Sequence, residues 1–210
     1  MTDFKFQLEQ IIANHLPGEI THLEMSPLNR GLSSVALQQA NNVKESAVAV
    51  LIFEVENRLQ CTLIQRPIYT GSHSGQVSFP GGKKDPTDLD LIHTAIRECW
   101  EEIGVILERD HLVGKLTPVY IPVSNFYVEP FVFYYPEIPT FEKDLREVEE
   151  VFTFHLDALL DESNVATVEM QISSNFTLKE VPCFVLEQKQ VWGATALILN
   201  ELKAVLKMIF

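Results

Sequence analysis

An uninterrupted apolar run at residues 47–53 constrains the fold of this 210-residue chain more than any other feature. Seven apolar residues without polar alternation are typical of a β-strand that is buried on both faces of its sheet. The run is too short to cross a bilayer, which takes roughly 20 residues. After a polar turn at 56–58, residues 59–65 resume a strand pattern. We therefore predict a hairpin whose first strand lies inside the fold.

Three other segments carry the apolar spacing of helices. The first ends at Pro17. The second is expected to begin with Thr87 or Asp88 as its N-cap and to end at Gly104. The third begins near residue 194 and has one apolar face, which indicates a packing helix and not a membrane anchor. Its predicted polar face consists of Asn200, Glu201, Lys203 and Lys207.

Further strands are predicted at residues 105–107, 112–120, 126–135, 148–155, 167–172 and 176–186. Strands on both sides of a central helix, followed by more strands and a closing helix, imply an α/β fold with a mixed β-sheet between helical layers. No repeat, low-complexity tract or long linker divides the chain. We therefore predict a single domain over 1–210, with an N-terminal helical extension at 1–46 and a C-terminal helix at 192–210.

Charge and cysteine content argue against several functions. A formal net charge of −13 leaves no basic excess with which to bind nucleic acid or an anionic membrane surface. The cysteines, Cys61, Cys99 and Cys183, are odd in number and widely spaced, which favours a reduced intracellular chain over a disulfide scaffold. The first residues show no basic segment followed by an apolar core. We therefore expect a soluble, cytoplasmic protein.

One short stretch concentrates the chemistry. If it is helical, Glu98, Glu101 and Glu102 lie on one face, where like charges oppose helix formation unless a cation is near. Gly81 and Gly82 upstream form a tight turn whose backbone can approach a ligand closely. Carboxylate oxygens with a nearby carbonyl are the ligands that Mg²⁺ or Mn²⁺ prefers. We interpret the stretch as part of a metal-dependent hydrolase that acts on a phosphoanhydride; the alternative is a solvated acidic surface.

The stretch and the glycine turn together resemble the signature of the Nudix hydrolase superfamily. The matching residues are Arg97-Glu98-Cys99-Trp100-Glu101-Glu102-Ile103-Gly104-Val105. The resemblance implies a Nudix-type α/β/α sandwich with a catalytic loop-helix-loop that uses Mg²⁺ or Mn²⁺. Asp88 stands where the family has a glutamate, and one extra residue separates Gly82 from Arg97. The role of Asp88 and the number of metal ions stay open.

The resemblance also implies which residues act. The catalytic and metal-binding set consists of Arg97, Glu98, Glu101, Glu102 and the Gly81 carbonyl. Within it, Glu98 and Glu102 would be the primary metal ligands, and Arg97 would orient the glutamates. Glu147 or Glu150 would supply a further ligand or the general base, whose identity stays open.

A second resemblance, upstream of the first, is to the coenzyme A pyrophosphatases of this superfamily. The matching residues are Arg66, Gly75, Phe79, Pro80, Gly81 and Gly82. It implies hydrolysis of coenzyme A (CoA) or acyl-CoA to 3′,5′-ADP and 4′-phosphopantetheine or its acyl form. Gly71 stands where the motif has a second arginine, which leaves the exact substrate and acyl preference open. The expected substrate contacts are Arg66, His73, Gly75, Phe79, Gly82 and Lys83.

Two alternatives remain at this level. The chain could be a Nudix pyrophosphatase for ADP-ribose, NADH or another nucleoside diphosphate derivative. It could also be a non-catalytic module that binds a nucleotide or CoA, although such modules usually lack part of the glutamate set that this chain retains. The family resemblance also suggests a homodimer.

Overall fold

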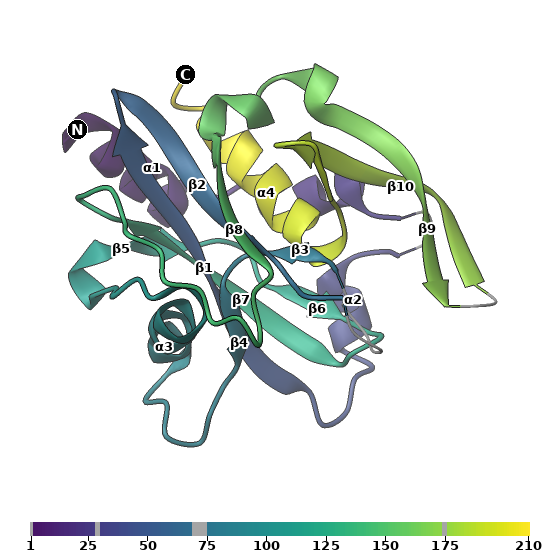
Figure 1. Cartoon of the computed structure of the whole chain (residues 1–210). Helices are drawn as coiled ribbons and strands as arrows, with labels where there is room; N and C mark the ends of the chain where they lie inside the picture. Colours follow the sequence, from purple (N-terminus) through teal and green to yellow (C-terminus); the bar gives the residue numbers. More distant parts are fainter. Residues whose placement is uncertain (1, 28–29, 69–74, 174–175) are drawn as a thin grey trace.

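The computed structural model describes residues 2–27, 30–68, 75–173 and 176–210. At its centre, strand β1 (Lys44–Val55) contains the apolar run and forms the predicted hairpin with β2 (Arg58–Gln65). The turn between them places Glu56 and Asn57 at positive φ angles of 50° and 64°. The opposite edge of β1 pairs in parallel with β7 (Phe126–Tyr134), so β1 lies between two long strands (Figure 1).

The other strands of the main sheet attach to these three. They are β3 (Val77–Ser78), β4 (Gly81–Lys83), β5 (Leu112–Lys115), β6 (Val119–Ile121) and β8 (Glu150–His155). The strand order is β3-β2-β1-β7-β5, with β4 paired to β1, β6 to β7 and β8 to β2. Parallel and antiparallel pairs coexist, which confirms the predicted mixed sheet. The strand predicted at 105–107 is wrong: Val105 and Leu107 are buried in strand-like alternation, but the segment is not assigned to a strand.

Helices cover both faces of the sheet, as predicted. Ile52 of β1 points into the core formed with α1 (Thr2–Asn14) and α4 (Gly193–Leu206). Its neighbour Leu51 points into the core formed with α3 (Leu91–Ile103). Both side chains are fully buried, and burial of such a side chain contributes about 1.5–3 kcal/mol. Alternate residues of one strand therefore stabilise the two helical layers of an α/β/α sandwich.

A smaller sheet lies beside α4 (Figure 1). Its strands are β9 (Val165–Ser173), β10 (Phe176–Leu186) and β11 (Lys189–Val191), in the order β11-β10-β9. The first two confirm the predicted strands at 167–172 and 176–186. The β9–β10 hairpin extends away from the body of the molecule (Figure 1). Short 3-10 helices complete the second half of the chain: η2 (Arg109–His111), η3 (Leu156–Leu159) and η4 (Glu162–Asn164).

The segment after α1 packs against α4 and contains two short helices, η1 (Glu19–Met25) and α2 (Ser33–Leu37). This contact corrects the interpretation of α4, because most of its predicted polar face is buried. The Glu201 side chain has 0% exposure. Its carboxylate accepts hydrogen bonds from the amide of Gly18 at 2.9 Å and from the amide and hydroxyl of Thr117 at 2.7 and 2.6 Å. The acidic residue thus joins the N-terminal extension to the rest of the molecule.

Two sequence-based expectations concern the chain as a whole. Within the described ranges, no helix has both the length and the apolar character needed to span a membrane. Cys61, Cys99 and Cys183 are free and buried, in agreement with the prediction that they do not form a disulfide scaffold.

Candidate active site

Helix α3 is fixed at both ends. Its N-cap is Asp90, whose carboxylate accepts a hydrogen bond from the His93 amide at 2.8 Å, so the predicted caps Thr87 and Asp88 are wrong. At the other end, Gly104 adopts a φ of 74° and closes the last turn. This left-handed conformation favours glycine. Local interactions therefore fix where the helix begins and ends, and this determines the direction in which each of its glutamates points.

Asp88 instead forms the base of the site. Its carboxylate is fully buried and accepts hydrogen bonds from Nε and Nη2 of Arg97, each at 3.0 Å. It also accepts hydrogen bonds from the Thr94 hydroxyl and the Asp85 amide, both at 2.9 Å. The Arg97 guanidinium is the main cause that holds the pKa of Asp88 well below its usual range, and Asp88 in turn raises the pKa of Arg97. Asp88 therefore fixes the orientation of Arg97.

We predict that Asp88→Asn lowers turnover about 10- to 100-fold, the usual cost when a group that orients an active-site residue is lost. The amide can accept only one of the two Arg97 hydrogen bonds, so the guanidinium should tilt. Steady-state kinetics would measure the effect. The matched control is Asp90→Asn, because asparagine caps a helix as well as aspartate does. Equal losses in the two variants would show that Asp88 acts only through helix stability.

Arg97 in turn orients two of the glutamates of α3. Its Nη1 donates to Glu98 at 2.8 Å and to Glu101 at 2.7 Å, and its Nη2 donates to the Lys83 carbonyl at 3.2 Å. Glu101 is half exposed. One guanidinium therefore links the buried Asp88, two glutamates of α3 and the backbone of β4.

Glu102 lies deeper than the sequence indicated. Only 1% of the residue is exposed, although its spacing puts it on the same face of the helix as Glu98 and the half-exposed Glu101. Its carboxylate accepts a hydrogen bond from the Gly81 amide at 2.8 Å, and Nη2 of Arg66 lies 3.6 Å from its other oxygen. Burial raises the pKa of Glu102 to about 8, against the lowering effect of Arg66. The structure thus brings Arg66 and Gly81, two predicted site residues, to one glutamate.

Glu98 lies against Gly82. A Cβ atom placed on Gly82 would be 2.5 Å from the Glu98 carboxylate, so only glycine leaves room for it. Burial raises the pKa of Glu98, and the ion pair with Arg97 opposes this shift. Both expected metal ligands therefore contact the glycine turn, Glu102 through a hydrogen bond and Glu98 through close packing.

We predict that Gly82→Ala lowers turnover by about 100-fold while the fold is kept, because the methyl group displaces a flexible carboxylate by roughly 1 Å. Gly81→Ala is the contrasting variant. Gly81 has a φ of 155°, and its Cβ would overlap the backbone of Ala47 and Val48, so it should cost about 1–3 kcal/mol of stability. Turnover and denaturant midpoints of both variants would test this. A Gly82→Ala protein with normal turnover would contradict the close packing on Glu98.

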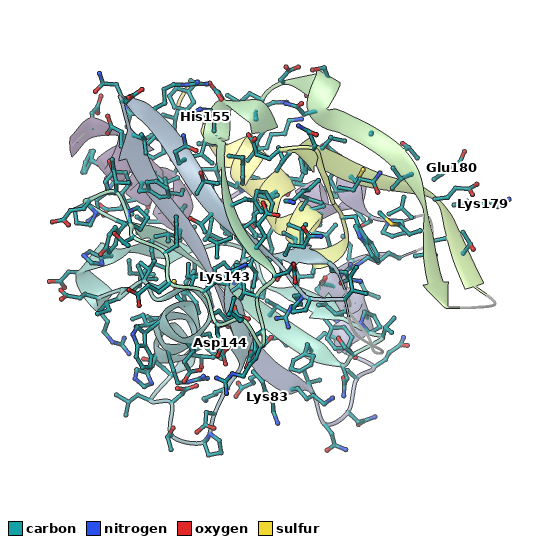
Figure 2. The ribbon with its side chains drawn as sticks, viewed as in Figure 1. Lys83, Lys143, Asp144, His155, Lys179 and Glu180 are labelled. Atoms are coloured by element: carbon teal, nitrogen blue, oxygen red, sulfur yellow. The ribbon has the colours of Figure 1, made fainter. Side chains whose placement is uncertain are left out.

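The loop after β7 returns over the C-terminal end of α3, near the labelled Asp144 (Figure 2). The Asp144 amide donates to the Glu102 carbonyl at 3.0 Å, and the Asp144 carbonyl accepts from the Glu147 amide at 3.1 Å. After burial, the charge of Glu147 is among the causes that raise the pKa values of Glu98 and Glu102. Glu150 instead forms an ion pair with Lys189 of β11 at 2.8 Å. Of the two candidate extra ligands, Glu147 therefore lies on the loop that contacts the end of α3, whereas Glu150 is paired with Lys189.

The described side chains show which groups could bind a metal ion. Within the residues described, no group of three or more His, Cys, Asp or Glu side chains is placed to hold an ion. The predicted set of three glutamates is therefore not assembled: Glu98 and Glu101 both accept from Nη1 of Arg97, and Glu101 is half exposed. The partly buried Glu98 and the buried Glu102 remain as two carboxylates whose charges repel each other. Such hard oxygen donors fit a divalent cation, which would offset that repulsion.

The structure does not place Phe79, Gly75 or His73 in the substrate-binding role predicted for each of them. Phe79 is 1% exposed and packs in the core between the sheet and α4, which gives it a structural role instead. Gly75 has a φ of 67°, which explains the need for glycine there. His73, like Gly71, lies outside the described residues.

Two solved structures share this architecture. A MutT/nudix family protein from Enterococcus faecalis aligns with a TM-score of 0.53 at 12% identity, over 91% of this chain and 72% of that one. The Nudix hydrolase RenU from M. smegmatis aligns with a TM-score of 0.52 at 16% identity, over 80% and 88%. At these identities the likeness shows the fold: a Nudix-type α/β/α sandwich with a mixed sheet.

Sequence comparison gives the family. The NUDIX domain family matches residues 43–173, which include β1, α3 and β9. Human mitochondrial coenzyme A diphosphatase NUDT8 is 39% identical over 130 residues, 61% of this chain and 55% of that protein. The uncharacterized Nudix hydrolase NudL of Yersinia enterocolitica is 33% identical over 180 residues, 83% of this chain and 91% of that protein. The chain spans about half the length of the human relative. It belongs to the NUDIX family.

Proposed function

We propose that this protein is a Nudix pyrophosphohydrolase that cleaves the phosphoanhydride of CoA or acyl-CoA with Mg²⁺ or Mn²⁺. The observation that carries the proposal is the pair of carboxylates, the partly buried Glu98 and the buried Glu102, that meet the Gly81–Gly82 turn and contact Arg97 and Arg66. Two like charges held close together favour the binding of a cation between them.

The residues have separate tasks in the proposed reaction. A bound divalent ion would screen the pyrophosphate oxygens and activate water. Glu98 and Glu102 would hold the ion, Arg97 would keep Glu98 in place, and Arg66 would bind a phosphate oxygen of the substrate. The oxygen of water forms a bond to one phosphorus, the bridging P–O bond breaks, and two phosphomonoesters leave. Glu147 would act as a further ligand or as the base.

The substrate class rests on two similarities. The segment from Gly75 to Gly82 resembles the motif of CoA pyrophosphatases, and a relative named a coenzyme A diphosphatase is 39% identical to this chain over 130 residues. The products would be 3′,5′-ADP and 4′-phosphopantetheine or its acyl form.

Incubation of the purified chain with CoA and Mn²⁺, followed by chromatographic separation of products, tests the proposal. We expect 3′,5′-ADP and 4′-phosphopantetheine in equal amounts. ADP-ribose and NADH should be run in parallel: faster cleavage of either would move the protein to the nucleoside-diphosphate pyrophosphatases. Binding without turnover of every compound would indicate a non-catalytic nucleotide or CoA-binding module.

A further inference from the structure

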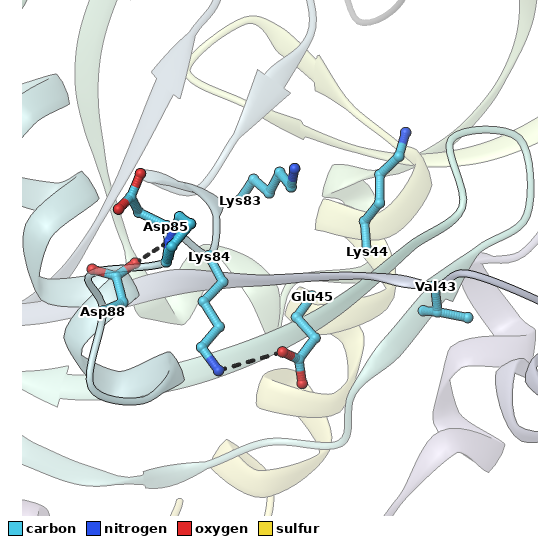
Figure 3. Close-up of a pocket in the computed structure, with 8 residues that line it drawn as sticks. Val43, Lys44, Glu45, Lys83, Lys84, Asp85 and Asp88 are labelled. Atoms are coloured by element: carbon cyan, nitrogen blue, oxygen red, sulfur yellow. Dashed lines mark hydrogen bonds and ion pairs between the residues drawn. The ribbon is translucent and has the colours of Figure 1, made fainter.

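A pocket at the start of β1 is lined by three lysines whose side chains the proposed catalytic centre does not use (Figure 3). Its volume is about 490 Å³, and it is lined by Val43, Lys44, Glu45, Lys83, Lys84, Asp85, Pro86 and Asp88. The pocket adjoins the candidate active site, because Lys83 follows Gly82 in the chain and its carbonyl accepts a hydrogen bond from Arg97 at 3.2 Å.

The carboxylates of the pocket already have partners. Glu45 forms an ion pair with Lys84 at 3.4 Å. Asp85 accepts hydrogen bonds from the amide and hydroxyl of Thr87 at 2.9 and 2.6 Å. Asp88 is buried in the ion pair described above. These acidic groups are therefore matched within the chain.

Lys44 and Lys83 are not matched in this way. In the β1–β4 ladder Lys83 lies opposite Ser46, so strand alternation places it on the same face as Lys44. Figure 3 shows both ammonium groups on one side of β1, with the Lys84–Glu45 pair on the other. Within the described part of the chain, neither lysine forms an ion pair with a carboxylate. The Lys44 ammonium donates a hydrogen bond to the Ser124 carbonyl at 3.4 Å and lies 5.1 Å from the centre of the Phe126 ring.

We propose that Lys44 and Lys83 bind a second anionic group of the substrate, a phosphomonoester separate from the pyrophosphate that is cleaved. The inference rests on the proposed function. Gly82 of β4 lies against Glu98 on one side of the sheet, and the side chain of the next residue, Lys83, points to the opposite side. A nucleotide whose pyrophosphate lies at Glu98 would therefore pass over this short strand to place a sugar phosphate beside the two amines, which would attract it electrostatically. The pair would select nucleotides that carry an additional phosphate on the ribose.

Isothermal titration with 3′,5′-ADP and 5′-AMP tests the site without any turnover. We expect the wild-type protein to prefer 3′,5′-ADP by about tenfold, as for one charged hydrogen-bonded contact. Lys44→Ala and Lys83→Ala together should abolish the preference. Lys84→Ala is the matched control, because its amine is paired with Glu45, and should keep it. A preference that is absent in the wild type, or that survives in the double variant, overturns the site.

Kinetics separate this inference from the proposed function. CoA and dephospho-CoA differ only in the ribose phosphate, so the ratio of their kcat/KM values should fall about tenfold in the double lysine variant. Equal kcat/KM values for both compounds in the wild type would leave a CoA hydrolase and refute the lysine site. If neither compound is cleaved while the lysine-dependent preference for 3′,5′-ADP persists, the lysine site stands and the CoA assignment fails.

Discussion

Glu98→Gln and Glu102→Gln should each lower kcat at least about 100-fold, more than the loss of an outer-shell partner of a metal ligand. Glutamine keeps the shape and can still accept the hydrogen bond from the Gly81 amide, but it removes the negative charge that would hold a divalent ion. Neither variant should lower the melting temperature, since a neutral amide is cheaper to bury than a carboxylate. Steady-state assays over a range of Mn²⁺ concentrations, with calorimetric Tm values, would measure both effects.

The matched control is Glu101→Gln. Glu101 is half exposed and contacts Arg97 but not the glycine turn, so its loss should reduce kcat less than tenfold, in line with an exposed ion pair. If Glu101→Gln lowered kcat more than Glu98→Gln and Glu102→Gln do, our assignment of the primary ligands would be reversed. Near-normal turnover in both primary variants would refute their catalytic role.

Glu201→Ala should produce the largest loss of stability, roughly 3 kcal/mol or a fall in Tm of about 6–12 °C. The change leaves the Gly18 amide and both Thr117 donors without their buried acceptor. Burial acts to raise the pKa of Glu201, but the His22 ring, 3.7 Å away, and the Thr117 donors outweigh it, so the pKa lies below its usual 4.5. The folded state therefore favours the ionised carboxylate.

The lowered pKa of Glu201 determines how its contribution to stability changes with pH. Because the pKa is lowered on folding, the stability that Glu201 contributes is fully present above pH 4.5 and is lost as the pH falls toward the folded-state pKa. Urea unfolding of the wild type and the Ala variant should differ most at neutral pH and least in acid. Glu201→Gln should be intermediate, because the three donors bond two different carboxylate oxygens and the amide nitrogen that replaces one of these oxygens cannot accept. A gap between wild type and Ala variant that does not depend on pH would contradict the ionised network.

The sequence predicted the parts of the fold that local pattern determines. The apolar run located β1, the turn at 56–58 located the hairpin, and Gly104 marked the end of α3, because each depends on neighbours in the chain. The N-cap was misplaced for a physical reason: Asp88 and Asp90 are equally good caps by type. Which of them caps the helix depends on the recruitment of Asp88 by Arg97, nine residues later.

The sequence indicated which residue types meet at the candidate site, but not how deeply each side chain is buried. Position along the helix could not show that Glu102 is buried, because its burial depends on the Gly81 amide, 21 residues away. The polar face of α4 was misjudged for the same reason: Glu201 bonds Gly18 across 183 residues. One available signal was missed. Asp88 lies six residues after Gly82, where the family has a glutamate, and this position could have indicated a partner for Arg97.

The parallel pairing of β1 with β7 also bears on how the protein is made. Lys44 lies opposite Phe126, so the ribosome must release the hairpin, the acidic helix and β7 before the central strand has both its neighbours. Long-range pairing of this kind slows folding. The face of β1 that holds Ile52 stays open until α4 has been synthesised, and α4 follows every strand of both sheets in the chain. Nascent chains that stall before α4 would expose an apolar sheet to aggregation and should depend on chaperones.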